Sequence, residues 1–457
     1  MSSTISMRSP GAIMLQATTH VSINSLPGPP GRLRSTWKLM TRPYETYGDW
    51  SRRYGKSFRV KALNGTVLAT SNTENIRRIL AARHDEVSQF AIGTISPLIG
   101  EHSVLIVAGE RHKRARSLLA PPFRGEALRN SMQTMQAIAD RVAANWKPGS
   151  SIRVMDTSLE YSLDVIIEVV FGVQDPDRVQ QFKSAIKSYV GGFRPIFAFT
   201  KLFQKRWVPA WNRFLKERER FDALLDLQIA GQRERQHEGF NIISMLLKSR
   251  DEDGNPLGES ELRDHLITLL FAGHETTQIA IAWAMSWLHR NPPILKRFRE
   301  ELNSTDSLEE MLSSDLLDGI CHEALRLNPI VADFLRVFQK PIELEEITLP
   351  AGSSAAILSC VVHQDPDIYP EPEKFNPDRW LTHPARPNEF LAFGGGIRRC
   401  IGATMALMEM KIALVTWLRR FEFALPPNAP PIEPVHRRNL TMAPKSGIEL
   451  MVIKEIS

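Results

Sequence analysis

The chain has 457 residues, of which 43% are hydrophobic and 24% charged, with a formal net charge of +6. This composition is ordinary for a soluble globular protein, and the sequence shows neither a fixed repeat nor a low-complexity tract. The basic residues are dispersed, mostly beside acidic ones, which argues against nucleic-acid binding. The three cysteines, Cys321, Cys360 and Cys400, form no CxxC pair. They indicate a reducing compartment and exclude a disulfide scaffold.

Residues 1–26 are rich in Ser and Thr, and their longest apolar run covers only residues 12–15. A membrane span needs about 20 apolar residues, and a signal-peptide core also needs a longer run. We therefore expect a flexible N-terminal tail over residues 1–26 and a soluble, cytoplasmic protein without a transmembrane anchor. The length suggests about three domains, or one large core built mostly of helices.

The region after the tail alternates helical and strand patterns. Asn64-Gly65 is a strong hairpin signal between two short β patterns, and Thr73 is a possible helix cap. The predicted elements are a helix over 44–54, strands over 57–62 and 66–69, and a helix over 73–82. Residues 90–107 are apolar and predicted to be irregular, which is unusual for a loop of this length unless it covers a ligand. Packing on the core is an equally good interpretation.

A basic helix is predicted to open at Gly109 and to stop near Pro121. His112 and Arg116 are four residues apart and share one face of this helix. Two donors on one face suit an anionic ligand group, while the alternative is a solvated basic surface. Further helices are predicted over 127–146, 158–171, 175–190 and 211–236.

The longest helical pattern covers residues 259–290, which corresponds to about 48 Å. Its residues Leu269, Ala272, Gly273, Thr276 and Ala280 fall on one face, and most are small enough to leave space beside the helix. The Thr276 hydroxyl can bond a carbonyl of its own helix and bend it. A zinc-protease site at His274-Glu275 would need a second histidine at position 278, which is Gln278.

The C-terminal third combines helices, short strands and an irregular segment. The predicted elements are helices up to residue 328, strands within 336–358, an irregular stretch over 369–387, a helix over 403–420, and strands over 421–425 and 448–452. The stretch from Phe393 to Gly402 is a glycine-rich loop that ends in Cys400, directly before the last helix. A helix N-terminus favours a thiolate, which indicates a haem-iron ligand loop. The alternative is an ordinary loop with a buried cysteine.

Several motifs together resemble the cytochrome P-450 family, in its soluble bacterial-like type, from about residue 26 to the end. They are the loop with Phe393, Gly396, Arg398, Cys400 and Gly402, the helix segment Ala272-Gly273-His274-Glu275-Thr276-Thr277, Glu323 with Arg326, the segment from Phe375 to Arg379, and His112 with Arg116. Each motif alone is weak, but their shared order makes chance implausible. Many family members have a tryptophan where this chain has His112, which is a mild departure because histidine also donates to carboxylates.

The resemblance implies a mainly α fold with small β-sheets, a long central helix over a haem, and a single domain over residues 27–457. Haem b is the implied cofactor, with Cys400 as the thiolate ligand of its iron. The remaining implied residues have three roles. Phe393, Gly402 and Ala272 line the haem, and His112, Arg116, Arg336 and Arg398 bind its propionates. Thr276 and Glu275 deliver protons, and Glu323, Arg326 and Arg379 form a buried structural cluster.

The implied activity is a haem-thiolate monooxygenase that inserts one oxygen atom from O2 into an apolar or amphipathic small molecule. A peroxide-using or isomerising haem-thiolate enzyme and a non-catalytic haem sensor are the alternatives. The expected partners are a ferredoxin and its NAD(P)H-linked reductase, and a monomer is expected. The ferredoxin, an acidic protein, is predicted to dock on a basic face formed by Arg111, Lys113, Arg114, Arg399 and Lys411. Substrate contacts are predicted from residues 90–107, 191–207, 269–276, 330–334 and 440–442. Asp333 among them either meets a substrate group or pairs with a haem-side arginine.

Overall fold

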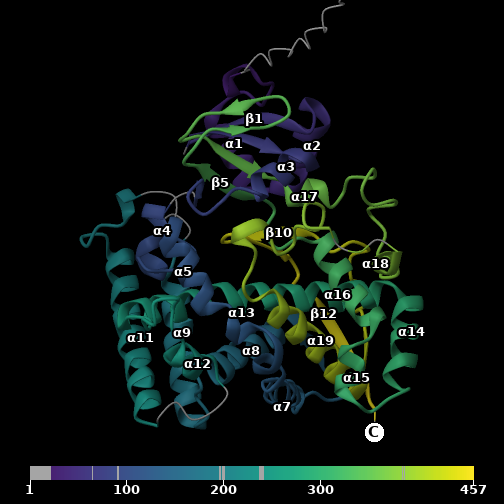
Figure 1. The fold of residues 1–457 in the computed structure, drawn as a ribbon. Helices are drawn as coiled ribbons and strands as arrows, with labels where there is room; N and C mark the ends of the chain where they lie inside the picture. The colour runs from purple at the N-terminus through teal and green to yellow at the C-terminus, as the bar shows by residue number, and fades with distance from the viewer. Residues whose placement is uncertain are drawn as a thin grey trace, which may run out of the picture.

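The computed structural model describes residues 22–63, 65–89, 92–194, 197, 201–235, 241–382, 384 and 386–456. A large helical part forms the lower body, and a smaller part built on a sheet stands above it (Figure 1). This confirms the expected mainly helical fold with small sheets. Among the described residues, no helix is both long and apolar enough to cross a membrane.

The helices vary widely in length, and α13 is the longest of those described. Their bounds are α1 (Arg32–Thr41), α2 (Pro43–Tyr54), α3 (Thr73–Leu80), α4 (Ile92–Ile99), α5 (Gly109–Leu119), α6 (Gly125–Arg129), α7 (Met132–Ala143), α8 (Val154–Val165), α9 (Pro176–Gly192), α11 (Pro209–Glu234), α12 (Ile242–Lys248), α13 (Glu259–Arg290), α14 (Pro292–Leu302), α15 (Leu308–Leu312), α16 (Asp315–Leu327), α17 (Ser359–Val362), α18 (Arg379–Thr382) and α19 (Ala403–Arg420).

The strands form one five-stranded sheet, in the upper part of the molecule, and smaller sheets of two or three strands (Figure 1). Their bounds are β1 (Ser57–Ala62), β2 (Gly65–Thr70), β3 (Val87–Ser88), β4 (Ser151–Arg153), β5 (Phe334–Phe338), β6 (Ile342–Glu343), β7 (Thr348–Leu349), β8 (Ser354–Ile357), β9 (Phe421–Ala424), β10 (Val435–Arg438), β11 (Thr441–Pro444) and β12 (Glu449–Glu455). The largest sheet has the order β1-β2-β8-β5-β3, and β12 pairs with both β4 and β9. The predicted hairpin is confirmed, because β1 and β2 pair antiparallel from Ser57↔Thr70 to Ala62↔Gly65.

Helix α13 crosses the helical body and packs against α8, α16 and α19 (Figure 1). The prediction of its bounds is confirmed at both ends. Its start is fixed by Gly258, whose backbone N–H donates to the Glu261 carboxylate at 3.0 Å. Its end is fixed by Asn291, after which Pro292 opens α14, since proline suits the first turn of a helix.

Two local predictions differ from the structure. Residues 92–99 form α4 although they were expected to be irregular. Pro97 is tolerated there because the helix is short and the burial of Leu98 and Ile99 holds it against α13. The cap of α3 is Asn72 rather than Thr73, since the Asn72 side chain accepts the N–H groups of Glu74 and Asn75 at 2.9 and 3.0 Å.

The N-terminal tail lies largely outside the described residues, which start at Ser22. Ile23–Ser25 form a short 3-10 helix, and Ile23 and Leu26 pack against a hydrophobic cluster of the upper sheet. The described end of the expected tail therefore packs on the upper sheet.

Candidate functional site

The loop from Phe393 to Gly402 is a tight turn that places Cys400 directly before α19. The Cys400 N–H donates to the Phe393 carbonyl at 2.9 Å, which closes the loop. Gly394 and Gly396 have φ of 64° and 62°, a conformation that residues with a Cβ rarely adopt. A Cβ on Gly396 would come within 2.2 Å of the Leu80 carbonyl oxygen. The glycines therefore let this loop lie close to α3.

The thiol of Cys400 faces solvent on one side and is closely surrounded by protein on the others. Desolvation by these surroundings raises its pKa. The backbone N–H of Gly402 and the guanidinium groups of Arg116 and Arg399 lower the pKa of the same thiol. Arg116 also donates to the Arg399 carbonyl at 2.8 Å, so it fixes the residue before Cys400.

Four basic residues predicted from separate motifs gather near this loop. The pKa of Arg398 is lowered to about 10, first by burial and then by the charges of Arg336 and Arg116. Burial likewise lowers the pKa of Arg336 to about 10. Within the described residues, neither Arg336 nor Arg398 pairs with a carboxylate, and the buried Nε of Arg398 has no hydrogen-bond partner. Cations concentrated in this way without a counterion favour an anionic ligand.

His112 lies in the same cluster, near Arg398, Arg116 and Arg336. It also contacts His84, a partner that was not predicted from the sequence. Its Nδ1 lies 2.8 Å from the Nδ1 of His84, so one ring donates to the other. Burial and the charge of Arg398 lower the pKa of His112 to about 3, so its ring is neutral in the protein alone. His112 can donate a hydrogen bond as a neutral ring. A carboxylate bound beside it would raise its pKa.

On α13, Ala272 and Thr276 face an accessible space although they lie in the middle of a largely buried helix. The Thr276 hydroxyl donates to the Ala272 carbonyl at 2.6 Å. The helix remains α-helical through this point, so the bond does not open it. A Cβ on Gly273 would meet Ile166 at 2.9 Å, which explains the glycine by close packing against the segment after α8.

Glu275 points toward the β10–β11 hairpin rather than standing free. Its Oε1 lies 3.2 Å from the Nε of Arg438. Burial raises the pKa of Glu275, while Arg438 and the Asn439 and Thr441 side chains lower it. The neighbouring His274 is buried against the Leu270 carbonyl at 2.6 Å. No cluster of three or more His, Cys, Asp or Glu side chains that could hold a metal ion occurs in the described part of the chain.

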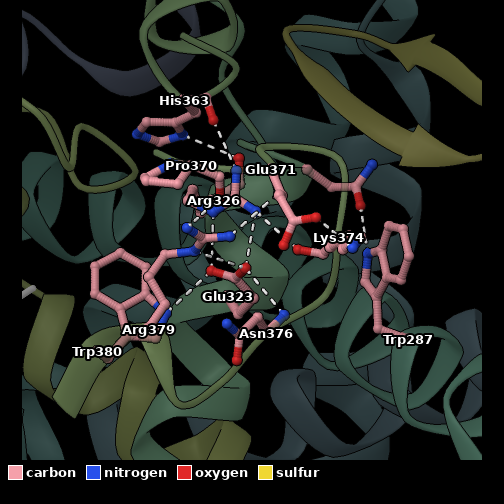
Figure 2. Close-up of polar contacts among 11 residues, drawn as sticks. Trp287, Glu323, Arg326, His363, Pro370, Glu371, Lys374, Asn376, Arg379 and Trp380 are labelled. Atoms are coloured by element: carbon pink, nitrogen blue, oxygen red, sulfur yellow. Dashed lines mark hydrogen bonds and ion pairs between the residues drawn. The ribbon is translucent and has the colours of Figure 1, made fainter. Parts of the chain in front are cut away.

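The predicted ionic cluster of Glu323, Arg326 and Arg379 is present (Figure 2), and all three residues are buried. Arg326 lies 2.8 Å from the Glu323 carboxylate, and Arg379 lies 3.2 Å from it. The two arginines also donate to carbonyls of the irregular segment, those of Lys374, Pro370 and Glu371. The cluster therefore ties α16 to the segment that leads to the cysteine loop.

His363 extends this cluster to the loop itself and was not predicted from the sequence. Its Nδ1 lies 3.1 Å from the Arg326 carbonyl, and its Nε2 accepts the Leu391 N–H at 2.8 Å. Burial lowers the pKa of His363 to about 3, so the ring is neutral with its proton on Nδ1. Figure 2 shows the ring above Arg326, and it stacks on Phe390 with an interplanar angle of 13°.

Asp333 was predicted either to meet a substrate group or to pair with a haem-side arginine, and the second of these roles is not observed. Its charged neighbour is Arg437, and Tyr47 donates a hydrogen bond to it, so no haem-side arginine of the cluster above pairs with it. Burial raises the pKa of Asp333. The predicted substrate segments are described only in part, because residues 90, 91, 195, 196 and 198–200 lie outside the described residues.

Comparisons with known proteins show which family the chain belongs to. The sequence profile named Cytochrome P450 matches residues 28–451. Cytochrome P450 135B1 of Mycobacterium bovis is 32% identical over 383 residues, which cover 82% of this chain and 80% of the relative. Cytochrome P450 135A1 of Mycobacterium tuberculosis is 31% identical over 440 residues, which cover 93% of this chain and 95% of the relative.

Solved structures show the same fold. The retinoic-acid-bound cyanobacterial CYP120A1 has a TM-score of 0.81 at 23% identity, covering 94% of this chain and 100% of that one. The haem domain of cytochrome P450DA has a TM-score of 0.83 at 22% identity, and the match covers 94% of this chain and 98% of that one. The fold is that of these cytochrome P450 structures. The chain belongs to the cytochrome P450 family, whose members are monooxygenases with haem b.

The residues around the loop fit this cofactor. Haem b carries two propionate carboxylates and needs an axial ligand to its iron. The buried cations without a carboxylate partner, and the unpartnered Nε of Arg398, suit the propionates. The accessible thiol of Cys400 suits the metal.

Proposed function

We propose that this monooxygenase inserts one oxygen atom into an apolar or amphipathic small organic substrate, by hydroxylation or epoxidation. The observation that supports this most is the accessible Cys400 thiol beside buried cations that lack a carboxylate partner. Haem b, when bound, supplies the oxygen-activating chemistry, and a thiolate ligand favours O–O cleavage. We further propose that residues 27–457 form one domain, and that the protein acts as a cytoplasmic monomer.

In this proposal the loop residues hold the cofactor. Cys400 ligates the metal, and coordination deprotonates its thiol despite the raised pKa of the free group. Gly402 contributes the N–H that lowers the pKa of that thiol, and Phe393 accepts the Cys400 N–H and holds the loop closed. The propionates are bound by the charged Arg116, Arg336 and Arg398 and by neutral His112.

Residues of α13 would make room for the substrate and transfer protons on the side of the cofactor opposite Cys400. Ala272 has no side chain beyond Cβ and leaves room there. Thr276 donates to the Ala272 carbonyl, so its hydroxyl oxygen remains free to accept a proton donor such as water. Glu275 exchanges protons with solvent when its ion pair with Arg438 opens. Glu323, Arg326 and Arg379 keep the irregular segment in place without entering the chemistry.

We propose a ferredoxin as the electron donor, supplied by an NAD(P)H-linked reductase. Arg111 and Lys113 on α5 and Arg399 in the cysteine loop are exposed, and such cations suit an acidic partner. Two members of the predicted face form close ion pairs within the protein, whereas the exposed Lys113 lies 3.9 Å from Glu110. Arg114 pairs with Asp251 and Glu261 at 2.6 and 3.0 Å, and Lys411 pairs with Asp318 at 2.7 Å. The docking face is therefore smaller than the sequence predicted.

The experiment is a comparison of electron sources with one substrate found by a spectral-shift screen. Product formation with O2, a surrogate ferredoxin and its reductase, and none with hydrogen peroxide alone, is expected. Product with peroxide alone would favour the peroxide-using alternative. Substrate-independent NADPH consumption without any product would favour a non-catalytic haem protein.

A further inference from the structure

His84 and His112 bring two imidazole rings together beside the buried arginines of the site. Their Nδ1 atoms lie 2.8 Å apart, and their ring centroids lie 4.9 Å apart with an interplanar angle of 44°. The N–H of Gly109, the first residue of α5, also donates to the His84 carbonyl at 3.1 Å. A backbone bond and a side-chain bond therefore both join His84 to the helix that carries His112.

The turn that carries His84 is itself held in place. The Glu86 N–H donates to the Arg83 carbonyl at 3.0 Å, which closes the turn. Strand β3 follows directly and pairs antiparallel with β5, the strand that also carries Arg336. His84 therefore has a fixed position relative to both α5 and β5.

A single proton lies between the two Nδ1 atoms, because both rings are neutral at neutral pH. Burial lowers the pKa of His84, and it lowers the pKa of His112 to about 3. A neutral imidazole carries its one proton on either Nδ1 or Nε2, and the other nitrogen is an acceptor. The ring that donates from Nδ1 therefore has a bare Nε2, whereas the ring that accepts at Nδ1 keeps its proton on Nε2.

The two rings differ in what their Nε2 atoms can meet. His112 is only 1% exposed, and its Nε2 has no hydrogen-bond partner within the described residues. A carboxylate can accept a hydrogen bond from this nitrogen but cannot donate one to it, so binding a carboxylate there requires the proton on Nε2. His84 is half-buried, so water can donate to a bare Nε2 on that ring. This difference favours His84 as the donor of the pair.

We propose that His84 is a positioning residue, whose Nδ1–H donates to the Nδ1 of His112 and keeps the His112 proton on Nε2, ready for a haem propionate. This inference rests on the proposed function, in which His112 binds that carboxylate. The other basic residues of the cluster are Arg116, Arg336 and Arg398, and a guanidinium group has donors only. His112 alone among the four can present either a donor or an acceptor, so it alone needs a partner that fixes its proton.

The first test locates the proton by NMR. The full-length holoenzyme is prepared with isotope-labelled histidine, and two-bond nitrogen–hydrogen correlations are recorded on its reduced carbon monoxide complex, which is diamagnetic. The signals of His112 are assigned by their loss in His112→Gln, and those of His84 by their loss in His84→Asn. A bare Nδ1 and a protonated Nε2 are expected for His112. A proton on Nδ1 of His112 would overturn the proposal.

The second test measures the rate of haem transfer from the holoenzyme to apomyoglobin. His84→Leu removes the donor and should speed haem loss about fivefold, because the His112 proton is then free to move to Nδ1. His84→Asn places an amide N–H where the Nδ1–H was and should keep the original rate. Arg83→Gln is the control, since this side chain lies in the same turn and pairs with Asp85 and Glu86. It should also keep the original rate.

Unchanged haem loss in His84→Leu, or equally fast loss in His84→Leu and His84→Asn, would overturn the proposal. Circular dichroism checks that each variant is folded, and if His84→Leu does not fold, the NMR measurement on the unmodified holoenzyme decides. The unmodified protein also separates this proposal from the function on which it rests. A missing red-shifted band in its reduced carbon monoxide complex would contradict the haem-thiolate assignment, whereas the band together with a His112 proton on Nδ1 would contradict only the role of His84.

Discussion

Glu275 of α13 and Arg438 of β10 form an ion pair across the site, with 3.2 Å between Oε1 and Nε. Asn439, with φ of 54°, and Thr441 of the same hairpin also lie close enough to lower the pKa of Glu275. Residues 440–442 are the hairpin positions predicted to contact substrate. The acid expected to exchange protons is therefore held by the segment expected to sense the substrate.

Substituting Arg438 with Gln should shift the pH dependence of turnover. Burial raises the pKa of Glu275 and Arg438 lowers it, so loss of the guanidinium leaves a higher pKa. The limb of the profile that reports this carboxylate should move to higher pH by about one unit. Arg437→Gln, on the same strand but bonded to the Leu39 carbonyl, is the control. Identical profiles for Arg438→Gln and the unmodified enzyme would remove Arg438 from this role.

Thr276→Ala should leave haem binding intact and divert reducing equivalents to hydrogen peroxide. The Thr276 hydroxyl stands on the accessible face of α13, and without it the water that brings protons loses a partner. The measurement is the ratio of peroxide to product per NADPH consumed. Thr277→Ala makes the same change at the next, buried position and should keep the ratio. Fully coupled turnover in Thr276→Ala would contradict the assignment.

Glu323→Gln should destabilise the protein by about 3–5 kcal/mol, because it leaves two buried arginines without their counterion. Urea unfolding followed by circular dichroism and Soret absorbance measures this change. The exposed pair Glu371–Lys374 provides the control, and Glu371→Gln should cost less than about 1 kcal/mol. If Glu323→Gln and Glu371→Gln lowered the free energy of unfolding by similar amounts, the buried cluster would not be what holds the irregular segment in place.

His363→Asn should be less stable than the unmodified protein, by an amount that depends on pH. Burial beside Arg326 lowers the pKa of His363 to about 3, while the unfolded chain protonates this histidine below about 6.5. The contribution of the neutral ring is complete above that pH and is lost as pH falls toward 3. The difference between the two proteins should therefore narrow by about 1.4 kcal/mol per pH unit below 6.5. A constant difference from pH 7 to pH 5 would contradict this.

The sequence predicted the long elements and the local motifs well. Helices α13 and α19 have the predicted bounds because long periodic patterns end at clear signals, such as Asn291-Pro292 after α13. The Glu323–Arg326 contact follows from the spacing of the two residues on one helix. Arg379, which completes the cluster, was predicted only from the resemblance to the family.

The features that the sequence did not predict depend on contacts between distant segments. His363 joins Arg326 to Leu391, His84 meets His112, and Arg438 meets Glu275. No local pattern marks these partners. Helix α4 was missed for a related reason, because packing against α13 overrides the helix-breaking tendency of Pro97.

The central claim is that Cys400 provides the thiolate of a haem enzyme, and the absorbance of the reduced carbon monoxide complex tests it most directly. The unmodified protein should show the red-shifted Soret band of a thiolate-ligated haem. Cys400→Ser should lose that band, whereas Cys360→Ser, at a buried unpaired cysteine, should keep it. An unchanged red-shifted band in Cys400→Ser would contradict the assignment.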